Sequence, residues 1–211
     1  MKRLGILLSG RGSNFVAIAE AIRAGRLPGA EIAVVLSNVA DAGGLELARG
    51  MGLTAIAVPS QGRKRAEHDV EMIARLHQHR VELVCLAGYM RILTPEFVRA
   101  FRERILNVHP SLLPSFPGMD AQEQALEFGT KVAGCTVHFV DEAVDHGVIV
   151  VQRAVPVRDG DTAETLSARI LEQEHLAYPE AIAKVLSGEY GFAGRRYVRG
   201  PGSRFEIRGP S

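Results

Sequence analysis

Short runs that are apolar at nearly every position alternate along this chain with longer segments of helical periodicity. The apolar runs of the first half are rich in Val, Ile and Leu and cover residues 3–9, 31–37, 53–58, 81–88 and 104–108. Strands buried on both faces have this composition, because helices cover both sides of a parallel sheet. The intervening segments carry apolar residues at three-and-four spacing over 13–25, 43–52, 65–79 and 95–103. This alternation predicts an open α/β fold, with a mostly parallel central sheet and helices on both faces.

The order of elements changes after residue 107. A proline-rich loop and a helix near 121–128 are followed by two apolar strands, 134–140 and 148–157, in close succession. Strands joined by so short a connection pair antiparallel, so we expect an antiparallel C-terminal portion. We predict a single domain over residues 1–190, with two halves, about 1–100 and about 101–190. A basic, Gly- and Pro-rich tail over 191–211 would form a short ribbon and a loose end.

Charge and cysteine content exclude several classes of protein. The 211 residues carry 25 Lys and Arg against 24 Asp and Glu, a formal net charge of +1, which gives no general attraction to nucleic acid or membranes. Cys85 and Cys135 lie in apolar runs, so we expect two buried, unreactive thiols and no disulfide framework. Lys2 and Arg3 precede an apolar stretch that is too short for a signal peptide, so we expect a cytoplasmic protein.

The segment LLSGRGSNF ends the first predicted strand and opens the first helix. Gly10 and Gly12 allow a tight turn, and we expect Ser13 to cap the helix. Free amides at a helix N-terminus bind anions, and Ser13 and Asn14 add donors, so the loop is a candidate phosphate site. Phe15 stands where the dinucleotide fingerprint needs its third glycine, and no Walker Lys follows. The alternative is an ordinary strand-to-helix turn with a good cap.

The segment ILNVHPSLLPSFPG at 105–118 places Asn107 and His109 at a strand end, where side chains two apart project to the same side. Pro110, Pro114 and Pro117 then stiffen the chain, since each proline fixes φ and removes a backbone donor. The alternative for a single histidine is a hydrogen-bonded structural residue. The strand-end position, the neighbouring Asn and the proline frame favour a catalytic His109.

An orienting carboxylate for His109 is expected in the acidic loop VDEAVDHG, where Asp145 precedes a His-Gly turn. The alternatives are a solvated hairpin tip and a metal loop. The acidic residues are too few and too unevenly spaced for calcium, and the sequence has no zinc-type His or Cys pair. An Asn donor, a His and a carboxylate suit acyl-type transfer. No Ser or Cys lies in a nucleophile-elbow context, so direct attack by a substrate nucleophile is favoured over a covalent acyl-enzyme.

Two of the predicted helices have a recognisable apolar face. In the segment 65–79 we expect an apolar inner face made of Ala66, Val70, Ile73, Ala74 and His77. The last long helix is predicted to begin with Asp161 as N-cap and Glu164 as the reciprocal residue of a capping box. Glu174 lies in the middle of this helix's apolar stripe. Its carboxylate either reaches the edge of the stripe or points into a cleft, where it would hold a cationic or amine group.

Five motifs together resemble the phosphoribosylglycinamide formyltransferase family, folate-dependent enzymes of purine biosynthesis. They are SGRGSN at 9–14, LAGYMRIL at 86–93, ILNVHPSLLPSFPG at 105–118, GCTVHFVDEAVDHG at 134–147 and QEHLAYP at 173–179. The resemblance spans nearly the whole chain and implies a Rossmann-like formyltransferase fold, with a phosphate-binding first half and a folate-binding, catalytic second half. The related methionyl-tRNA formyltransferases carry a different first loop and a further C-terminal domain, and the deformylases carry an extra N-terminal domain.

The resemblance also implies roles for individual residues. The catalytic set would be Asn107, His109 and Asp145. The ribotide would be bound by Gly12, Ser13, Asn14 and Glu174. The folate would be bound by Arg65, Met90, Arg91, Ile92, Leu93 and Asn107. Arg63 or Lys64 could replace Arg65, and Val148 stands where the family commonly has Pro.

The implied reaction moves the formyl group of 10-formyltetrahydrofolate, a cosubstrate, directly to the amine of 5-phosphoribosylglycinamide, with no metal. His109, kept cationic by Asp145, would stabilise the tetrahedral oxyanion. We expect these two small molecules as binding partners, no nucleic acid or membrane, and a monomer or homodimer. The alternatives are a formyltetrahydrofolate deformylase that uses water, a sugar-nucleotide formyltransferase, and a non-catalytic nucleotide-binding module of flavodoxin-like architecture.

Overall fold

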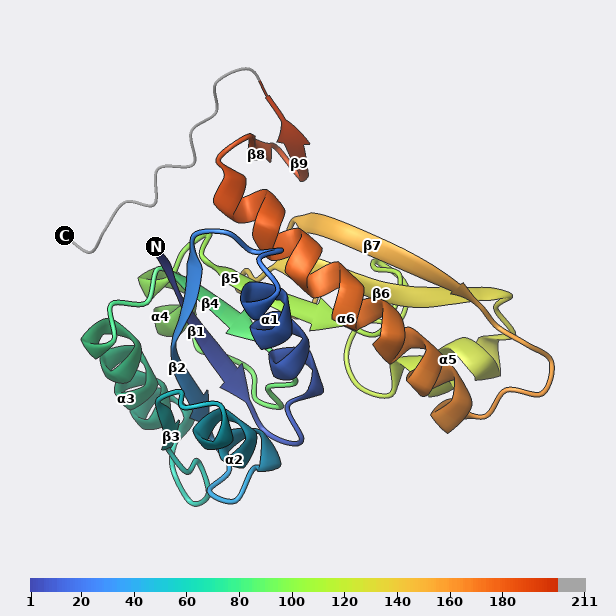
Figure 1. Cartoon of the computed structure of the whole chain (residues 1–211). Helices are drawn as coiled ribbons and strands as arrows, with labels where there is room; N and C mark the ends of the chain where they lie inside the picture. Colours follow the sequence, from blue (N-terminus) through green and yellow to red (C-terminus); the bar gives the residue numbers. More distant parts are fainter. Residues whose placement is uncertain (201–211) are drawn as a thin grey trace. The chain divides into compact units, whose positions relative to one another are not determined.

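The computed structural model of the protein describes residues 1–200 (Figure 1). Within them the chain divides into two compact units, residues 1–107 and residues 108–200. The loose end that we expect beyond residue 200 lies outside the described residues, and the domain boundaries expected from the sequence stay a prediction. No helix within residues 1–200 combines the length and the apolar composition that crossing a membrane requires.

The first unit alternates strands and helices. Its elements are β1 (Lys2–Leu8), α1 (Ser13–Arg23), β2 (Ala30–Ser37), α2 (Gly43–Gly50), β3 (Ala55–Ala57), α3 (Arg65–Gln78), β4 (Leu83–Leu86), α4 (Pro95–Ala100) and β5 (Ile105–His109). The last two residues of β5 belong to the second unit. The strand order is β3-β2-β1-β4-β5, and each neighbouring pair is parallel. The apolar runs therefore form strands where the sequence predicted them, and the parallel α/β class is confirmed.

The position of β1 in this sheet brings two loops together. β1 lies between β2 and β4, and its residues 4–8 are all buried. Parallel strands end at the same edge of a sheet, so the loops that follow β1 and β4 meet there. The Ser9 N–H accordingly donates to the Gly88 carbonyl at 3.0 Å. One edge of the unit thus carries both the 9–14 loop and the 88–94 loop.

Helix α1 begins at Ser13, and its N-cap is Gly12 in the left-handed region at φ 80. No side chain caps this helix, so the predicted Ser13 cap is wrong. A Cβ at residue 12 would also lie 2.9 Å from the Cα of Gly44, at the start of α2. The backbone conformation and the close approach to α2 both require glycine at this position.

Helix α3 buries a polar face that its periodicity did not predict. The buried residues are His68, Asp69, Met72 and Leu76. Val70, from the face that we expected to be inside, is 64% exposed. The ring of His68 donates from Nε2 to the Val58 carbonyl at 2.7 Å, and Oδ2 of Asp69 accepts from the Thr94 N–H at 2.7 Å. The predicted face is wrong because these two polar side chains each bind a backbone group and take the buried positions.

The second unit combines antiparallel strands with one long helix. After the end of β5 its elements are α5 (Ala121–Phe128), β6 (Val132–Phe139), β7 (Ile149–Pro156), α6 (Ala163–Ser187), β8 (Tyr190–Ala193) and β9 (Arg196–Arg199). β6 pairs antiparallel with β7, and β8 with β9, while β9 meets β7 in parallel at Arg196 and Ile149. Helix α6 packs along β6 and β7 (Figure 1). The antiparallel C-terminal portion is confirmed, and the terminal ribbon is the β8–β9 hairpin.

The N-cap of α6 is Thr162, so the predicted Asp161 cap is wrong. The Thr162 side chain accepts from the Thr165 N–H at 3.3 Å, and the Thr165 hydroxyl accepts from the Thr162 N–H at 2.9 Å. This reciprocal pair is a capping box that uses Thr165 in place of the expected Glu164. Asp161 instead lies before the helix, where its carboxylate accepts two hydrogen bonds from the Arg169 guanidinium, each at 2.7 Å.

Candidate active site

The proline-rich loop after β5 is held by polar side chains of two strands in the second unit. Thr136 on β6 donates to the Ser111 carbonyl at 2.7 Å and accepts from the Leu113 N–H at 3.0 Å. Gln152 on β7 donates to the Leu113 carbonyl at 2.8 Å. Prolines remove backbone donors from this loop, so these side chains satisfy much of what remains of its hydrogen-bonding capacity. The loop therefore leaves β5 along a defined path.

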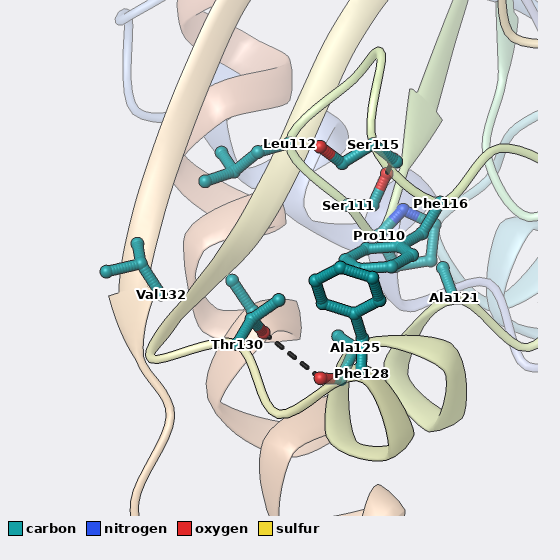
Figure 2. Close-up of a pocket in the computed structure, with 11 residues that line it drawn as sticks. Pro110, Ser111, Leu112, Ser115, Phe116, Ala121, Ala125, Phe128, Thr130 and Val132 are labelled. Atoms are coloured by element: carbon teal, nitrogen blue, oxygen red, sulfur yellow. Dashed lines mark hydrogen bonds between the residues drawn. The ribbon is translucent and has the colours of Figure 1, made fainter.

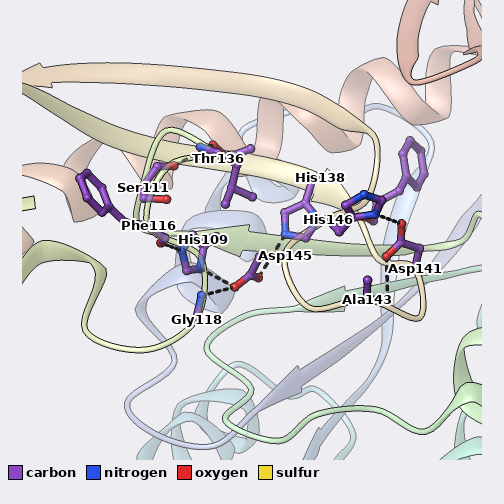
Figure 3. Close-up of polar contacts among 12 residues, drawn as sticks. His109, Ser111, Phe116, Gly118, Thr136, His138, Asp141, Ala143, Asp145 and His146 are labelled. Atoms are coloured by element: carbon purple, nitrogen blue, oxygen red, sulfur yellow. Dashed lines mark hydrogen bonds and ion pairs between the residues drawn. The ribbon is translucent and has the colours of Figure 1, made fainter. Parts of the chain in front are cut away.

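His109 ends β5 and is 5% exposed. Its Nδ1 lies 3.4 Å from Oδ2 of Asp145, and its Nε2 donates to the Phe116 carbonyl at 2.8 Å (Figure 3). Both neighbours are acceptors, and a protonated imidazole has a donor for each of them. In either charge state of the ring, a hydrogen at Nε2 points at a carbonyl oxygen.

Asp145 is the carboxylate that the sequence predicted for His109, and the structure brings the two side chains together. Its Oδ2 accepts from the Gly118 N–H at 2.8 Å, and its Oδ1 lies 3.7 Å from Nε2 of His138. Burial by itself would raise the pKa of Asp145, but the His138 ring, the Gly118 amide and the charge of His109 together lower that pKa below its ordinary value. The carboxylate is therefore ionised at neutral pH and lies between two imidazoles.

His138 is a residue of this site that sequence reasoning missed. It is 1% exposed on β6, and its Nδ1 lies 2.8 Å from the Phe139 carbonyl oxygen. A signal was present in the sequence, since Thr136 and His138 are polar residues two apart in an otherwise apolar strand and so face the same side. Thr136 on that side holds the proline-rich loop, and His138 contacts Asp145.

The turn that carries Asp145 has a constrained backbone. Asp145 lies in the left-handed region at φ 50, where a residue other than glycine costs about 1 kcal/mol or more. At Gly147 an added Cβ would lie 1.7 Å from the Phe139 carbonyl oxygen, so only glycine fits. The carboxylate of Asp141 accepts from the Ala143 N–H at 3.0 Å and so closes the start of the same loop. The position of Asp145 therefore depends on several specific local contacts.

Glu174 lies on the inner face of α6 and is 7% exposed. The alternative that its side chain reaches solvent at the edge of the apolar stripe is therefore wrong. Glu174 is close enough to Cys135 on β6 for its charge to act on the thiol. Burial, and secondarily the charge of Glu174, raises the pKa of the Cys135 thiol to about 12. Cys85 and Cys135 are both buried and free, as predicted. The role of Glu174 toward the substrate amine stays a prediction.

In the first unit, Ser9 joins the loop after β1 to the loop after β4. Its hydroxyl donates to Oδ1 of Asn38 at 2.6 Å and accepts from the Met90 N–H at 2.8 Å. Nδ2 of Asn38 then donates to the hydroxyl of Ser60 at 3.2 Å. Gly12 at the N-cap and the buried Asn14 place the predicted phosphate loop at the start of α1. The structure therefore places the predicted phosphate-binding and folate-binding loops side by side.

The 88–94 loop presents two of its apolar side chains to solvent. Met90 is 81% exposed and Ile92 is 55% exposed, whereas Leu93 is 9% exposed. The guanidinium of Arg91 lies at hydrogen-bonding distance, 3.5 Å, from the Arg63 carbonyl. Exposed apolar side chains on an anchored loop are suited to contact with a ligand ring. The folate role of these residues stays a prediction.

The predicted contact of Arg65 with the folate tail stays a prediction too. Arg65 is exposed at the start of α3, next to Lys64 at the N-cap. Arg63 forms an ion pair with Glu71 at 2.9 Å and also donates to the Glu67 carbonyl at 3.4 Å. An existing ion pair makes Arg63 less available to a carboxylate ligand than its two exposed neighbours.

Asn107 lies two residues before His109 on β5 and is half-buried. Its backbone position is fixed by pairing with Leu86 of β4. Side chains two apart on one strand project to the same side, as expected from the sequence.

Among residues 1–200, no group of three His, Cys, Asp or Glu side chains is placed to hold a metal ion.

A cavity of about 350 Å³ lies behind the proline-rich loop in the second unit (Figure 2). Its walls come from that loop, from α5 and from the start of β6, and they are mostly apolar. Phe116 and Phe128 both line it, and their rings contact each other edge to face with centroids 5.9 Å apart. Its polar lining groups include Thr130, whose hydroxyl donates to the Ala125 carbonyl at 3.1 Å. No pattern in the sequence predicts this cavity.

Comparison with known proteins gives a consistent match. The model of the formyl transferase family matches residues 2–182. The chain is 42% identical over 184 residues to phosphoribosylglycinamide formyltransferase of Escherichia coli K12, covering 87% of this chain and 86% of that protein. The crystal structure of glycinamide ribonucleotide transformylase 1 from Symbiobacterium toebii superposes with a TM-score of 0.91, with 51% identity and 94% coverage of both chains.

A larger protein contains a similar segment. The chain is 49% identical over 189 residues to the trifunctional purine biosynthetic protein adenosine-3 of Drosophila pseudoobscura pseudoobscura. That alignment covers 89% of this chain but only 14% of the insect protein. The similarity therefore concerns one part of that relative.

Proposed function

The chain belongs to the formyl transferase family, and from this premise we propose that it is a phosphoribosylglycinamide formyltransferase of purine biosynthesis. In this reaction the amine of 5-phosphoribosylglycinamide attacks the formyl carbon of 10-formyltetrahydrofolate. The observation that carries the proposal is His109, which a half-buried, ionised Asp145 orients and whose Nε2 hydrogen points at a carbonyl oxygen.

The Phe116 carbonyl indicates how His109 would treat a formyl group. It accepts from Nε2 at 2.8 Å, and a formyl oxygen at that place would present the same type of acceptor. As the amine attacks, this oxygen gains negative charge, and a donor fixed in advance stabilises it more in the transition state than in the ground state. Asn107, projecting to the same side of β5, supplies a second donor to the same oxygen.

Asp145 gives His109 its orientation and a charge of opposite sign. With its carboxylate near Nδ1, the ring is held with Nε2 toward the reacting oxygen. When the tetrahedral intermediate collapses, the bond from the formyl carbon to folate N10 breaks and N10 gains a proton. The attacking amine has lost a proton, so His109 can move one proton between the two nitrogens with no net change. His138 and the Gly118 amide keep the Asp145 carboxylate ionised throughout.

The substrates are distributed over the predicted binding residues. Amides at the N-terminus of α1, with the side chains of Ser13 and Asn14, bind the ribotide phosphate. The buried carboxylate of Glu174 meets the glycinamide amine. The backbone of the 88–94 loop binds the pterin, and Arg65 or Lys64 meets the glutamate tail. Monomer or homodimer and a cytoplasmic location remain expectations from the sequence.

The alternative hydrolase differs from this proposal in its acceptor. A deformylase would release tetrahydrofolate with water as the only nucleophile. The test is a spectrophotometric assay of tetrahydrofolate formation by the purified chain, with and without 5-phosphoribosylglycinamide. We expect formation to require the ribotide. Equal rates with and without it would replace the proposal by the hydrolase, and no formation under either condition would favour a binding module.

A further inference from the structure

The β8–β9 hairpin at the end of the described chain reaches the loop that carries Asp145. Arg195 lies in the turn of this hairpin, between Ala193 and Arg196. Its Nη2 donates to the His146 carbonyl at 2.5 Å, and its Nη1 lies 3.1 Å from Nε2 of the His146 ring. The residue that follows Asp145 is therefore bound both through its backbone and through its side chain.

The ring of His146 contacts both a carboxylate and a guanidinium. Its Nδ1 lies 2.9 Å from Oδ2 of Asp141 (Figure 3). Nη1 of Arg195 lies 3.4 Å from the same Nδ1 and 3.1 Å from Nε2, so the guanidinium is close to both ring nitrogens. The side chain of His146 is thus held by Asp141 and by Arg195 together.

The hairpin that supplies Arg195 is itself fixed to the strands on either side of the loop. The Phe139 ring, at the end of β6, contacts the rings of Phe192 and Tyr197 at centroid distances of 4.8 and 5.2 Å. On the other side, β9 pairs with Ile149, the first residue of β7. Arg195 directly precedes Arg196, the residue that pairs with Ile149. This pairing fixes the backbone of Arg195 relative to the loop between β6 and β7.

These contacts act on a backbone that needs support. Asp145 holds a left-handed conformation at φ 50, and Arg195 binds the carbonyl of the next residue, His146. On the other side, the Gly118 amide binds the carboxylate itself. Without Arg195, the loop would keep the Gly118 contact but lose the attachment that opposes relaxation of its backbone.

We propose that Arg195 is a positioning residue for Asp145, through the backbone and the ring of His146. The inference rests on the proposed function, in which Asp145 orients His109. The contacts of Arg195 are exposed to solvent, so they add little to global stability. Catalysis is more sensitive, because a displacement of about 1 Å in a catalytic group can cost up to 100-fold in rate. The hairpin therefore serves the active site more than the fold.

The test compares Arg195→Ala with Arg196→Ala in the ribotide-dependent assay. Arg196 is the next residue of the same hairpin and is exposed, so its variant is the matched control. We expect Arg195→Ala to lower kcat about tenfold while KM for both substrates and the urea midpoint stay near wild type. We expect Arg196→Ala to match wild type throughout.

Chemical rescue and a double-mutant cycle separate positioning from a structural role. Millimolar methylguanidinium should restore several-fold activity to Arg195→Ala and leave wild type and Arg196→Ala unchanged. In an Asp145→Asn background, Arg195→Ala should have almost no further effect, since the group that it positions is already removed.

Each outcome of these measurements either supports or overturns the positioning role of Arg195. Wild-type kcat in Arg195→Ala, or full additivity with Asp145→Asn, would overturn the inference. If Arg195→Ala does not fold, Arg195→Lys takes its place, because it keeps the charge but loses the two-point contact; a wild-type kcat there would equally refute positioning. Wild-type activity in Asp145→Asn alone would instead refute the proposed role of Asp145.

Discussion

Replacing Asp69 by Ala tests whether the 88–94 loop depends on its buried anchor. Asp69 is 1% exposed, and its Oδ2 accepts from the buried Thr94 N–H at 2.7 Å. Alanine leaves that N–H without its acceptor, which costs about 1–3 kcal/mol, and it also removes the packing of the buried side chain. We therefore expect a loss of about 3 kcal/mol in the free energy of unfolding, or roughly 6–12 °C in Tm for a chain of this size.

The isosteric variant Asp69→Asn separates the anchor from the charge. Its amide oxygen can still accept from Thr94, and its NH₂ group replaces Oδ1, which lies 3.6 Å from Nδ1 of His68. In a neutral ring that Nδ1 is an acceptor, because Nε2 gives its hydrogen to the Val58 carbonyl. We expect this variant to stay within about 1 kcal/mol of wild type.

The assay for both variants is urea unfolding followed by steady-state kinetics. Local loosening of the 88–94 loop should raise KM for the formyl folate about fivefold, equivalent to about 1 kcal/mol, and leave KM for the ribotide unchanged. Ribotide binding is the internal control, because the Ser9–Asn38 contact and the Gly12 N-cap of the phosphate loop do not involve the 88–94 loop. Equal losses in Asp69→Ala and Asp69→Asn, or a wild-type Asp69→Ala, would refute the reasoning.

Three further predictions concern the catalytic and phosphate-binding residues. Asn107→Ala and His109→Ala should each lower kcat by about 10²–10³ with the fold retained, measured in the ribotide-dependent assay, since each removes a preorganised donor. Replacing Ser13 and Asn14 together by Ala should weaken ribotide binding in calorimetry without changing folate binding; unchanged ribotide affinity would contradict the phosphate-loop role. The lowered pKa of Asp145 stabilises the folded state above the unfolded pKa of about 3.9, and this stabilisation is lost as pH falls through the folded pKa. Between about pH 5 and pH 3, wild type should therefore lose stability more steeply than Asp145→Asn in urea unfolding, and parallel curves would contradict the lowered pKa.

The strands of this protein could be predicted because their signal is local. A run that is apolar at every position can be buried only where neighbours cover both faces, and residues 4–8 of β1 show that outcome. The left-handed Gly12 and the strand-end position of His109 could also be predicted from short segments. In each case the deciding interactions lie within a few residues.

The wrong predictions, by contrast, concern residues whose partners lie in other segments of the chain. His68 and Asp69 are buried because each binds a backbone group. These partners, the Val58 carbonyl and the Thr94 amide, belong to segments outside α3. Periodicity places polar residues outside and has no information about such partners. The predicted N-cap of α6 is wrong for a different reason. Asp161 is a suitable cap by residue type, but its carboxylate accepts hydrogen bonds from Arg169.

The site was found only in part for the same reason. The pairing of His109 with Asp145 followed from chemistry, because a catalytic His needs an orienting carboxylate. The apolar composition around His138 predicts only a strand, although its spacing from Thr136 indicates a shared polar face. The sequence gives no indication of the hydrogen bonds of the Ser9 hydroxyl, because its two partners lie 29 and 81 residues away in the chain.

Formyl transfer to the ribotide can be followed through the formyl carbon itself. The purified chain would be incubated with formyl folate carrying carbon-13 in the formyl group and with 5-phosphoribosylglycinamide, and the products separated by mass spectrometry. The account predicts that the label appears on the ribotide as a formamide, in equal amount to the tetrahydrofolate formed, and that His109→Ala abolishes it. Recovery of the label as free formate would contradict the account.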